Sequence, residues 1–223
     1  MCGNCRKMEQ IITFPHPVEV CGSLEGYITT PKAYDPEKET LPVIVFLHGY
    51  NGTYLDFESI SQEGIPKYFM NDPDYRGHRV ITLVPRCPVD KFWNQFPHAL
   101  MEWIRAAMAH VGAKEDHVAI TGLSMGGFGT WEMLLTFPSF FCCGAPICGG
   151  GMSWRSWTLN SQRIRAFHGI DDDVVPLSYS LQMVQAAKEN GADVTLTTFD
   201  HVGHDSWTSA YEKTDLIDWL IFS

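Results

Sequence analysis

Six short apolar runs are spaced along the chain, each rich in β-branched or small residues and each ending at turn-forming residues. Near-continuous apolar runs of this length are typical of strands that are buried on both faces of a sheet. The six predicted strands are Pro42–Gly49, Arg79–Pro85, His117–Gly122, Phe141–Gly150, Arg163–Gly169 and Asp193–Phe199.

Between these runs, apolar residues recur at the three- and four-residue steps of amphipathic helices. The pattern predicts one helix over Leu100–Val111, one over Leu181–Lys188 and a closing helix from about Ser206 to Phe222. Strands that alternate with helices predict an α/β fold, with a mostly parallel central sheet and helices on both faces. We expect a single domain over residues 1–223, with residues 1–20 as a candidate for a loosely ordered N-terminal segment.

The composition and net charge indicate which kinds of partner the protein can bind. Hydrophobic residues make up 45% and charged residues 19%, as in an ordinary folded protein, and the formal net charge is −10. That sign argues against nucleic acid or an anionic membrane as a partner. The sequence contains neither an apolar run long enough to span a bilayer nor a secretory signal at its start, so we expect a cytoplasmic location. The oligomeric state is left open.

The seven cysteines favour reduced thiols over a disulfide framework. Cys2 and Cys5 form an isolated C-x-x-C pair, and a zinc site needs a second pair at metal spacing, which does not follow. Cys142, Cys143 and Cys148 lie in an apolar segment and are interpreted as small core residues. We therefore predict no metal and no cofactor.

A serine between glycines follows the third predicted strand. Gly122–Gly126 reads GLSMG, which matches the G-x-S-x-G turn that places a nucleophilic serine between a strand and a helix. The glycines suit a tight turn in which the serine backbone is strained. Ser124 is therefore the predicted nucleophile, and a structural turn is the alternative.

A serine hydroxyl needs a base to take its proton, and the base needs a carboxylate to orient it. Two later segments, FHGIDDDVVP and DHVGHDSW, follow predicted strands and supply both residue types in the order Ser, acid, His. The residues alone leave the acid open among three consecutive aspartates and the base open between two histidines. The candidates are Asp171, Asp172 and Asp173 for the acid, and His201 and His204 for the base. We interpret His168 as structural.

The motifs LHGYNG, VPRCP, GLSMGGFGTWE, FHGIDDDVVP and GHDSW, in this order, resemble the α/β-hydrolase superfamily. Within it, the chain is similar to a single-domain serine esterase branch related to dienelactone hydrolases, carboxylesterases and feruloyl-esterase-like proteins, some of them labelled predicted peptidases. The resemblance implies the α/β-hydrolase fold and aligns the acid with Asp172 and the base with His204. Dienelactone hydrolases proper use cysteine as the nucleophile, which makes their specific activity unexpected here.

An acyl-transfer site also needs donors for the oxyanion. The backbone N–H groups of Met125, directly after the nucleophile, and Tyr50, in the loop after the first strong strand, are the predicted donors. His48 in the same loop is interpreted as a structural support. Four tryptophans are predicted to line the substrate site: Trp93, Trp154, Trp157 and Trp207. For Arg155, a salt bridge is favoured over a grip on a substrate carboxylate.

These features predict a serine carboxylic-ester hydrolase that acts through an acyl-enzyme on small-molecule esters with short-chain or aromatic, feruloyl-like acyl groups. Two alternatives remain: a serine peptidase of the same fold, and a non-catalytic ligand-binding relative. The chain offers few residues for a lid, so we expect an open or partly covered site.

Overall fold

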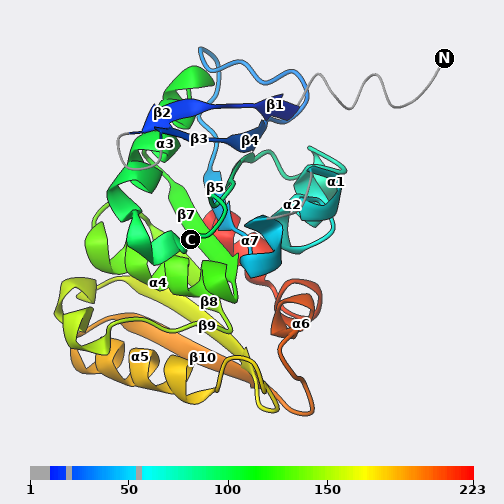
Figure 1. Cartoon of the computed structure of the whole chain (residues 1–223). Helices are drawn as coiled ribbons and strands as arrows, with labels where there is room; N and C mark the ends of the chain where they lie inside the picture. Colours follow the sequence, from blue (N-terminus) through cyan, green and yellow to red (C-terminus); the bar gives the residue numbers. More distant parts are fainter. Residues whose placement is uncertain (1–10, 19–21, 54–56) are drawn as a thin grey trace.

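A computed structural model of the chain describes residues 11–18, 22–53 and 57–223. Its centre is an eight-stranded sheet in the order β1-β4-β6-β5-β7-β8-β9-β10 (Figure 1). The six strands from β5 to β10 pair in parallel, and they confirm the six predicted strands. Their bounds are β5 Val43–Leu47, β6 Ile81–Pro85, β7 Val118–Leu123, β8 Cys143–Ile147, β9 Arg163–Gly169 and β10 Asp193–Phe199. The predicted α/β-hydrolase type of sheet is thus present.

Four short strands near the N-terminus are not among the predicted ones. They are β1 Ile11–Thr13, β2 His16–Val18, β3 Gly22–Leu24 and β4 Gly26–Thr29. β4 extends the sheet antiparallel to β6, β1 pairs antiparallel with β4, and β2 and β3 form a separate pair. Within the N-terminal segment for which loose order is expected, Ile11–Thr13 and His16–Val18 form strands β1 and β2. Residues 1–10, with Cys2 and Cys5, lie outside the described residues.

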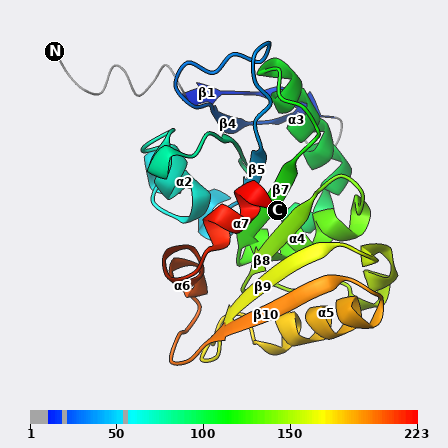
Figure 2. The ribbon, with the colours of Figure 1, turned by 180° about the vertical axis from the view of Figure 1, so that it is seen from behind.

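Helices cover both faces of the sheet, as predicted (Figures 1 and 2). One core cluster packs α3 Pro97–His110, α4 Met125–Thr136 and α5 Ser178–Glu189 against the sheet through residues such as Trp103, Leu134 and Met183. A second cluster lies on the opposite face with α2 Gly64–Phe69, α6 Ser206–Lys213 and α7 Leu216–Phe222. The remaining helical turns are α1 Phe57–Ile60, η2 Tyr50–Thr53, η3 Tyr75–Gly77, η4 Trp93–Gln95 and η5 Ser153–Leu159.

The predicted closing helix is two helices. Thr214 adopts extended backbone angles between α6 and α7, and its hydroxyl donates to the Ala210 carbonyl at 2.6 Å. The same hydroxyl accepts the N–H of Leu216 at 3.2 Å, so one side chain satisfies a group at the end of α6 and another at the start of α7. This local bonding lets α7 turn back over the sheet (Figure 2).

None of the helices in the described part of the chain is long and apolar enough to cross a membrane. Cys142, Cys143 and Cys148 are present as thiols, not disulfides. The loops after β5, β7, β9 and β10 lie beyond the carboxyl ends of parallel strands, which is where open α/β sheets bring their reactive groups together.

Candidate active site

Ser124 occupies the sharp turn between β7 and α4. Its backbone has φ 53° and ψ −117°, in the region that side chains rarely adopt. A Cβ atom on Gly122 would lie 2.5 Å from the carbonyl oxygen of Gly126, and one on Gly126 would collide with the carbonyl of Leu47. Glycine at both positions therefore allows a strained serine to point out of the sheet, as the sequence pattern predicts.

His204 bridges Ser124 and Asp172. Its Nδ1 lies 2.9 Å from Oδ2 and 3.0 Å from Oδ1 of Asp172, and its Nε2 lies 2.9 Å from Oγ of Ser124. An ionised carboxylate can only accept hydrogen bonds, so Nδ1 of His204 carries the proton and Nε2 is left to accept the serine hydroxyl. The structure thus brings together the three residues that the resemblance selects.

Asp172 is held in its ionised form by its surroundings. Burial opposes its charge, but the hydrogen bonds from His204 and from the backbone N–H groups of Val175 and Val174 outweigh this, and they hold the carboxyl pKa below its ordinary value. Oδ1 accepts the two backbone donors at 2.9 and 3.0 Å. A charged, fixed carboxylate is suited to orient His204.

The other candidate acid and base lie on the surface. The Asp171 side chain is 61% exposed and the His201 side chain is 96% exposed, and their nearest charged atoms are 3.9 Å apart. Asp173 is also exposed. These residues lie in the same loops as Asp172 and His204, but their side chains are exposed, whereas Asp172 and His204 are hydrogen-bonded to each other. The tertiary structure therefore distinguishes candidates that the residues alone leave open.

His168 is fully buried behind Asp172. Its Nδ1 lies 2.7 Å from the Ser180 hydroxyl, and its Nε2 lies 2.8 Å from the carbonyl of Val175 and 3.2 Å from Oδ2 of Asp172. This agrees with the structural interpretation of His168, but it also places the residue in contact with the acid. The sequence held a signal for it, because His168 stands four residues before Asp172 at the end of a predicted strand.

His48 supports the loop after β5. Its Nδ1–H donates to the Gly49 carbonyl at 2.7 Å, and its Nε2 accepts the N–H of Cys87 at 3.0 Å. Burial lowers the pKa of His48 to about 4, so the ring is neutral at physiological pH. These contacts join the loop after β5 to the segment around Cys87 and are those of a structural residue. This loop carries Tyr50, the first residue of η2.

A hollow of about 450 Å³ opens at Ser124. Its lining is mostly aromatic and apolar, with two amide side chains, and it includes both residues predicted to supply oxyanion donors. The lining residues are Tyr50, Phe92, Asn94, Gln95, Ser124, Met125, Phe128 and Val175. Sequence reasoning missed Phe92 and Phe128, although Phe128 follows the nucleophile by one helical turn.

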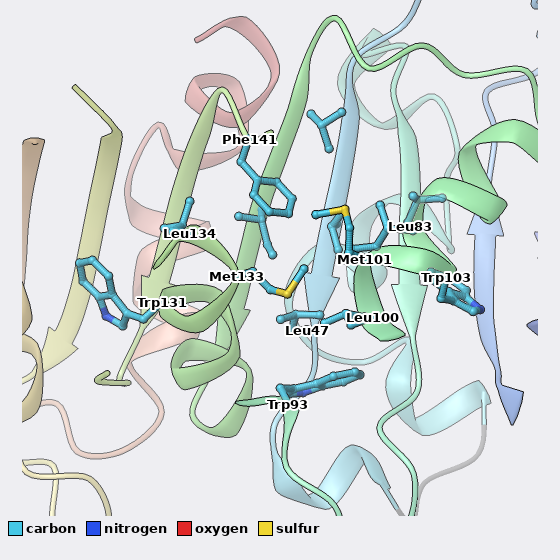
Figure 3. Close-up of a cluster of buried hydrophobic side chains, with 14 of the residues drawn as sticks. Leu47, Leu83, Trp93, Leu100, Met101, Trp103, Trp131, Met133, Leu134 and Phe141 are labelled. Atoms are coloured by element: carbon cyan, nitrogen blue, oxygen red, sulfur yellow. The ribbon is translucent and has the colours of Figure 1, made fainter. Parts of the chain in front are cut away.

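The four predicted substrate tryptophans do not line this hollow. Trp93 is 1% exposed and belongs to the hydrophobic core, and its indole N–H donates to the His48 carbonyl at 3.0 Å (Figure 3). Trp154 and Trp157 are 75% and 68% exposed on η5. Trp207 packs edge-on against the His204 ring, with centroids 5.5 Å apart, and lines a different hollow. The prediction of a tryptophan-lined pocket is therefore wrong.

Among the described residues, one group of possible metal ligands lies close together: Cys148, Asp172 and His204, with ligand atoms within 4.8 Å of one another. His204 and Asp172 are already hydrogen-bonded to each other. Burial raises the pKa of the Cys148 thiol to about 12, which disfavours the thiolate that a metal would need. This donor set is a poor fit for a metal.

Comparisons with known proteins show the family and the fold of the chain. A family model described as phospholipase/carboxylesterase matches residues 90–216, which is more than half of the chain and includes Ser124, Asp172 and His204. Esterase YjfP of Escherichia coli K12 is 26% identical over 204 residues, covering 72% of this chain and 81% of that protein.

Solved structures show the same fold. A thermostable esterase matches with a TM-score of 0.79 at 28% identity over 96% of this chain, which spans only 63% of that esterase. A feruloyl esterase module from Clostridium thermocellum, complexed with sinapinate, has a TM-score of 0.67 at 13% identity, covering 92% of this chain and 86% of the module. The chain belongs to the phospholipase/carboxylesterase family of α/β-hydrolase-fold enzymes.

Proposed function

We propose that this chain hydrolyses carboxylic esters through an acyl-enzyme formed on Ser124. The observation that carries the proposal is the hydrogen-bonded series from Asp172 through His204 to Ser124, which opens into the aromatic-lined hollow. Each hydrogen bond in the series is 2.9 Å, which is the reach that general-base activation of a serine requires.

In the first half of the reaction, Oγ of Ser124 attacks the ester carbonyl and Nε2 of His204 takes its proton. The charged imidazole is stabilised by Asp172, whose pKa is held low. Collapse of the tetrahedral intermediate breaks the bond to the alcohol, and His204 returns the proton to that leaving oxygen. In the second half, His204 activates water, which attacks the acyl carbon and releases the acid and Ser124.

The backbone N–H groups of Met125 and Tyr50 are our proposed donors to the oxyanion. Met125 is the first residue of α4, so its N–H lies at the helix end that has no intrahelical acceptor and favours negative charge. Both residues line the hollow together with Ser124. Donors of this kind, fixed before reaction, stabilise charge that develops only in the transition state.

The proposed substrates are esters with short-chain or aromatic acyl groups. The hollow has the volume of a small-molecule site, and the rings of Tyr50 and Phe92 stack beside it with centroids 5.7 Å apart. Aromatic walls favour planar apolar acyl groups. Among the described residues that line this hollow, none carries a carboxylate, an ammonium or a guanidinium group, so we expect its preferred ligands to be uncharged near the reacting carbon.

The test is hydrolysis of p-nitrophenyl esters from acetate to octanoate and of methyl ferulate, with Ser124→Ala beside the wild type. We expect turnover by the wild type and loss of about 1,000-fold or more in the variant. Equal turnover by both proteins would overturn the assignment of Ser124.

Two further experiments test the alternatives, a peptidase and a non-catalytic relative. An anilide with the acyl group of the best ester tests for a peptidase, because amide cleavage also requires His204 to protonate a leaving amine. Labelling by a fluorophosphonate tests for a non-catalytic relative, because only an activated serine reacts readily. We expect labelling at Ser124 and faster ester than amide cleavage.

A further inference from the structure

A second hollow of about 130 Å³ lies next to the one at Ser124. Asn94 and Phe128 line both hollows, so the two share a wall made of the same side chains. The far side of the second hollow is formed by Glu132, the segment Gly150–Met152 and Tyr179. The Phe128 and Tyr179 rings meet edge to face, with centroids 5.6 Å apart.

Helix α4 aligns the two hollows. Ser124 immediately precedes the helix, Phe128 follows it by four residues and Glu132 by eight. Residues four apart lie on nearly the same helical face, and eight residues rise by about 12 Å. The nucleophile, an aromatic wall and a carboxylate therefore form one stripe, while Met133 and Leu134 of the same helix pack into the core (Figure 3).

Glu132 is an unusual lining residue because its side chain is only 10% exposed. Its Oε1 accepts hydrogen bonds from Nη1 of Arg155 at 2.7 Å and from the hydroxyl of Thr136 at 2.8 Å. Both bonds end on Oε1, and the described residues supply no donor to Oε2. Oε2 is not among the fully buried polar atoms without a partner, so it keeps accessible surface from which it can accept a hydrogen bond from a ligand in the hollow.

We propose that the second hollow is an acyl subsite in which Oε2 of Glu132 accepts a hydrogen bond from a hydroxyl group at the far end of the acyl chain. The inference deepens the proposed esterase function and rests on it. Such a subsite favours esters of rigid aromatic acids whose ring carries a hydroxyl group para to the chain that ends in the carboxyl group, such as 4-hydroxycinnamoyl esters.

Length supports this substrate class. An extended 4-hydroxycinnamoyl group measures about 8 Å from its carbonyl carbon to its phenolic oxygen by ordinary bond lengths. A hydrogen bond adds about 3 Å, so the total approaches the rise between Ser124 and Glu132. The aromatic ring would then lie along Phe128. A phenol stays protonated at neutral pH and donates well to a carboxylate.

The charges of Glu132 and Arg155 disfavour acyl groups that end in a carboxylate. Arg155 is committed to Glu132, and its Nη2 also donates to the Thr136 hydroxyl at 2.9 Å. It is therefore not available to grip a substrate carboxylate, in agreement with the salt-bridge interpretation. An acyl group that ended in a carboxylate would meet Glu132 and be repelled.

The experiment compares kcat/KM for methyl 4-hydroxycinnamate and methyl 4-methoxycinnamate, in which a methyl group replaces the phenolic hydrogen and so removes the donor. The wild type should prefer the hydroxyl ester by about tenfold or more, because a site built for a hydroxyl discriminates against an analogue without it. In Glu132→Gln the ratio should fall toward one. Glu102→Gln makes the same chemical change at an exposed position on α3 and should keep the wild-type ratio.

Each variant is referenced to its kcat/KM on p-nitrophenyl acetate, whose acyl group is too short to reach Glu132. If Glu132→Gln does not fold with Arg155 unpaired, the double variant Glu132→Gln/Arg155→Met removes both charges and takes its place. The comparison of the two cinnamates on the wild type tests the proposal without any variant. Equal rates on the two cinnamates, or a preference that survives in the variant, would overturn the subsite and leave the esterase function standing. Failure on the acetate as well would overturn both.

Discussion

Nε2 of His168 lies 3.2 Å from Oδ2 of Asp172, and neither side chain has exposed surface. The other neighbour of this nitrogen is the Val175 carbonyl, which can only accept, so Nε2 carries a hydrogen that faces both acceptors. Asp172 is thereby held between two histidines, with His204 on the side of the nucleophile and His168 on the side of the core.

Removing this support should weaken catalysis without removing the triad. His168→Leu is expected to lower kcat for the best ester by about ten- to 100-fold with little change in KM, because a loosened Asp172 orients His204 less well. His168→Gln can still present an N–H and should recover part of the loss. A loss of folding stability with kcat preserved in the Leu variant would reduce His168 to a packing role.

Paired substitutions test whether Asp172 is the acid and His204 the base. Asp172→Asn and His204→Ala should each lower kcat/KM by about 1,000-fold or more, because the serine loses its oriented base. Asp171→Asn and His201→Ala make comparable changes on the exposed pair and should stay within about twofold of the wild type. Normal turnover in either of the first two variants would contradict the assignment.

His48 should make folding stability depend on pH. Burial lowers its pKa from 6.5 to about 4, so the unfolded chain binds a proton in this range that the folded protein does not. The contribution of His48 to the free energy of unfolding is therefore complete above about pH 6.5. It falls by about 3 kcal/mol as the pH is lowered toward 4.

Urea unfolding from pH 7 to pH 4 measures this effect. His48→Gln should be less stable at pH 7 but should lose less stability on acidification than the wild type does. His201→Gln, at an exposed histidine, should follow the wild-type curve. Parallel curves for all three proteins would show that His48 does not cause the pH dependence.

The buried and exposed tryptophans should differ in their effect on stability. Trp93→Phe removes the N–H donor to the His48 carbonyl and part of a fully buried ring, so it should cost about 2 kcal/mol of unfolding free energy. Trp154→Phe, at a mostly exposed position, should change it by less than about 0.5 kcal/mol. Thermal and urea unfolding measure both, and equal losses would contradict the burial difference.

The sequence by itself determined the six parallel strands of the central sheet, because each is a β-branched or apolar run that ends at turn residues. β5 to β8 are buried along their whole length, whereas the edge strand β10 is mostly exposed. The sequence also determined the elbow at Ser124, because the turn excludes side chains at Gly122 and Gly126. The short N-terminal strands escaped prediction because three or four residues carry too little pattern. The pairing of β4 with β6, which adds β4 and β1 to the central sheet, joins segments that lie far apart in the sequence.

Only the tertiary structure decided which side chains meet. Asp171 and Asp172 are neighbours in the chain and identical in chemistry, yet one is exposed and the other contacts His204. For the same reason, the sequence did not show that the four tryptophans lie outside the hollow at Ser124, or that Glu132 lies beside it. The direction of a side chain at the end of a strand or on a helix depends on what packs against it, and those partners come from distant parts of the chain.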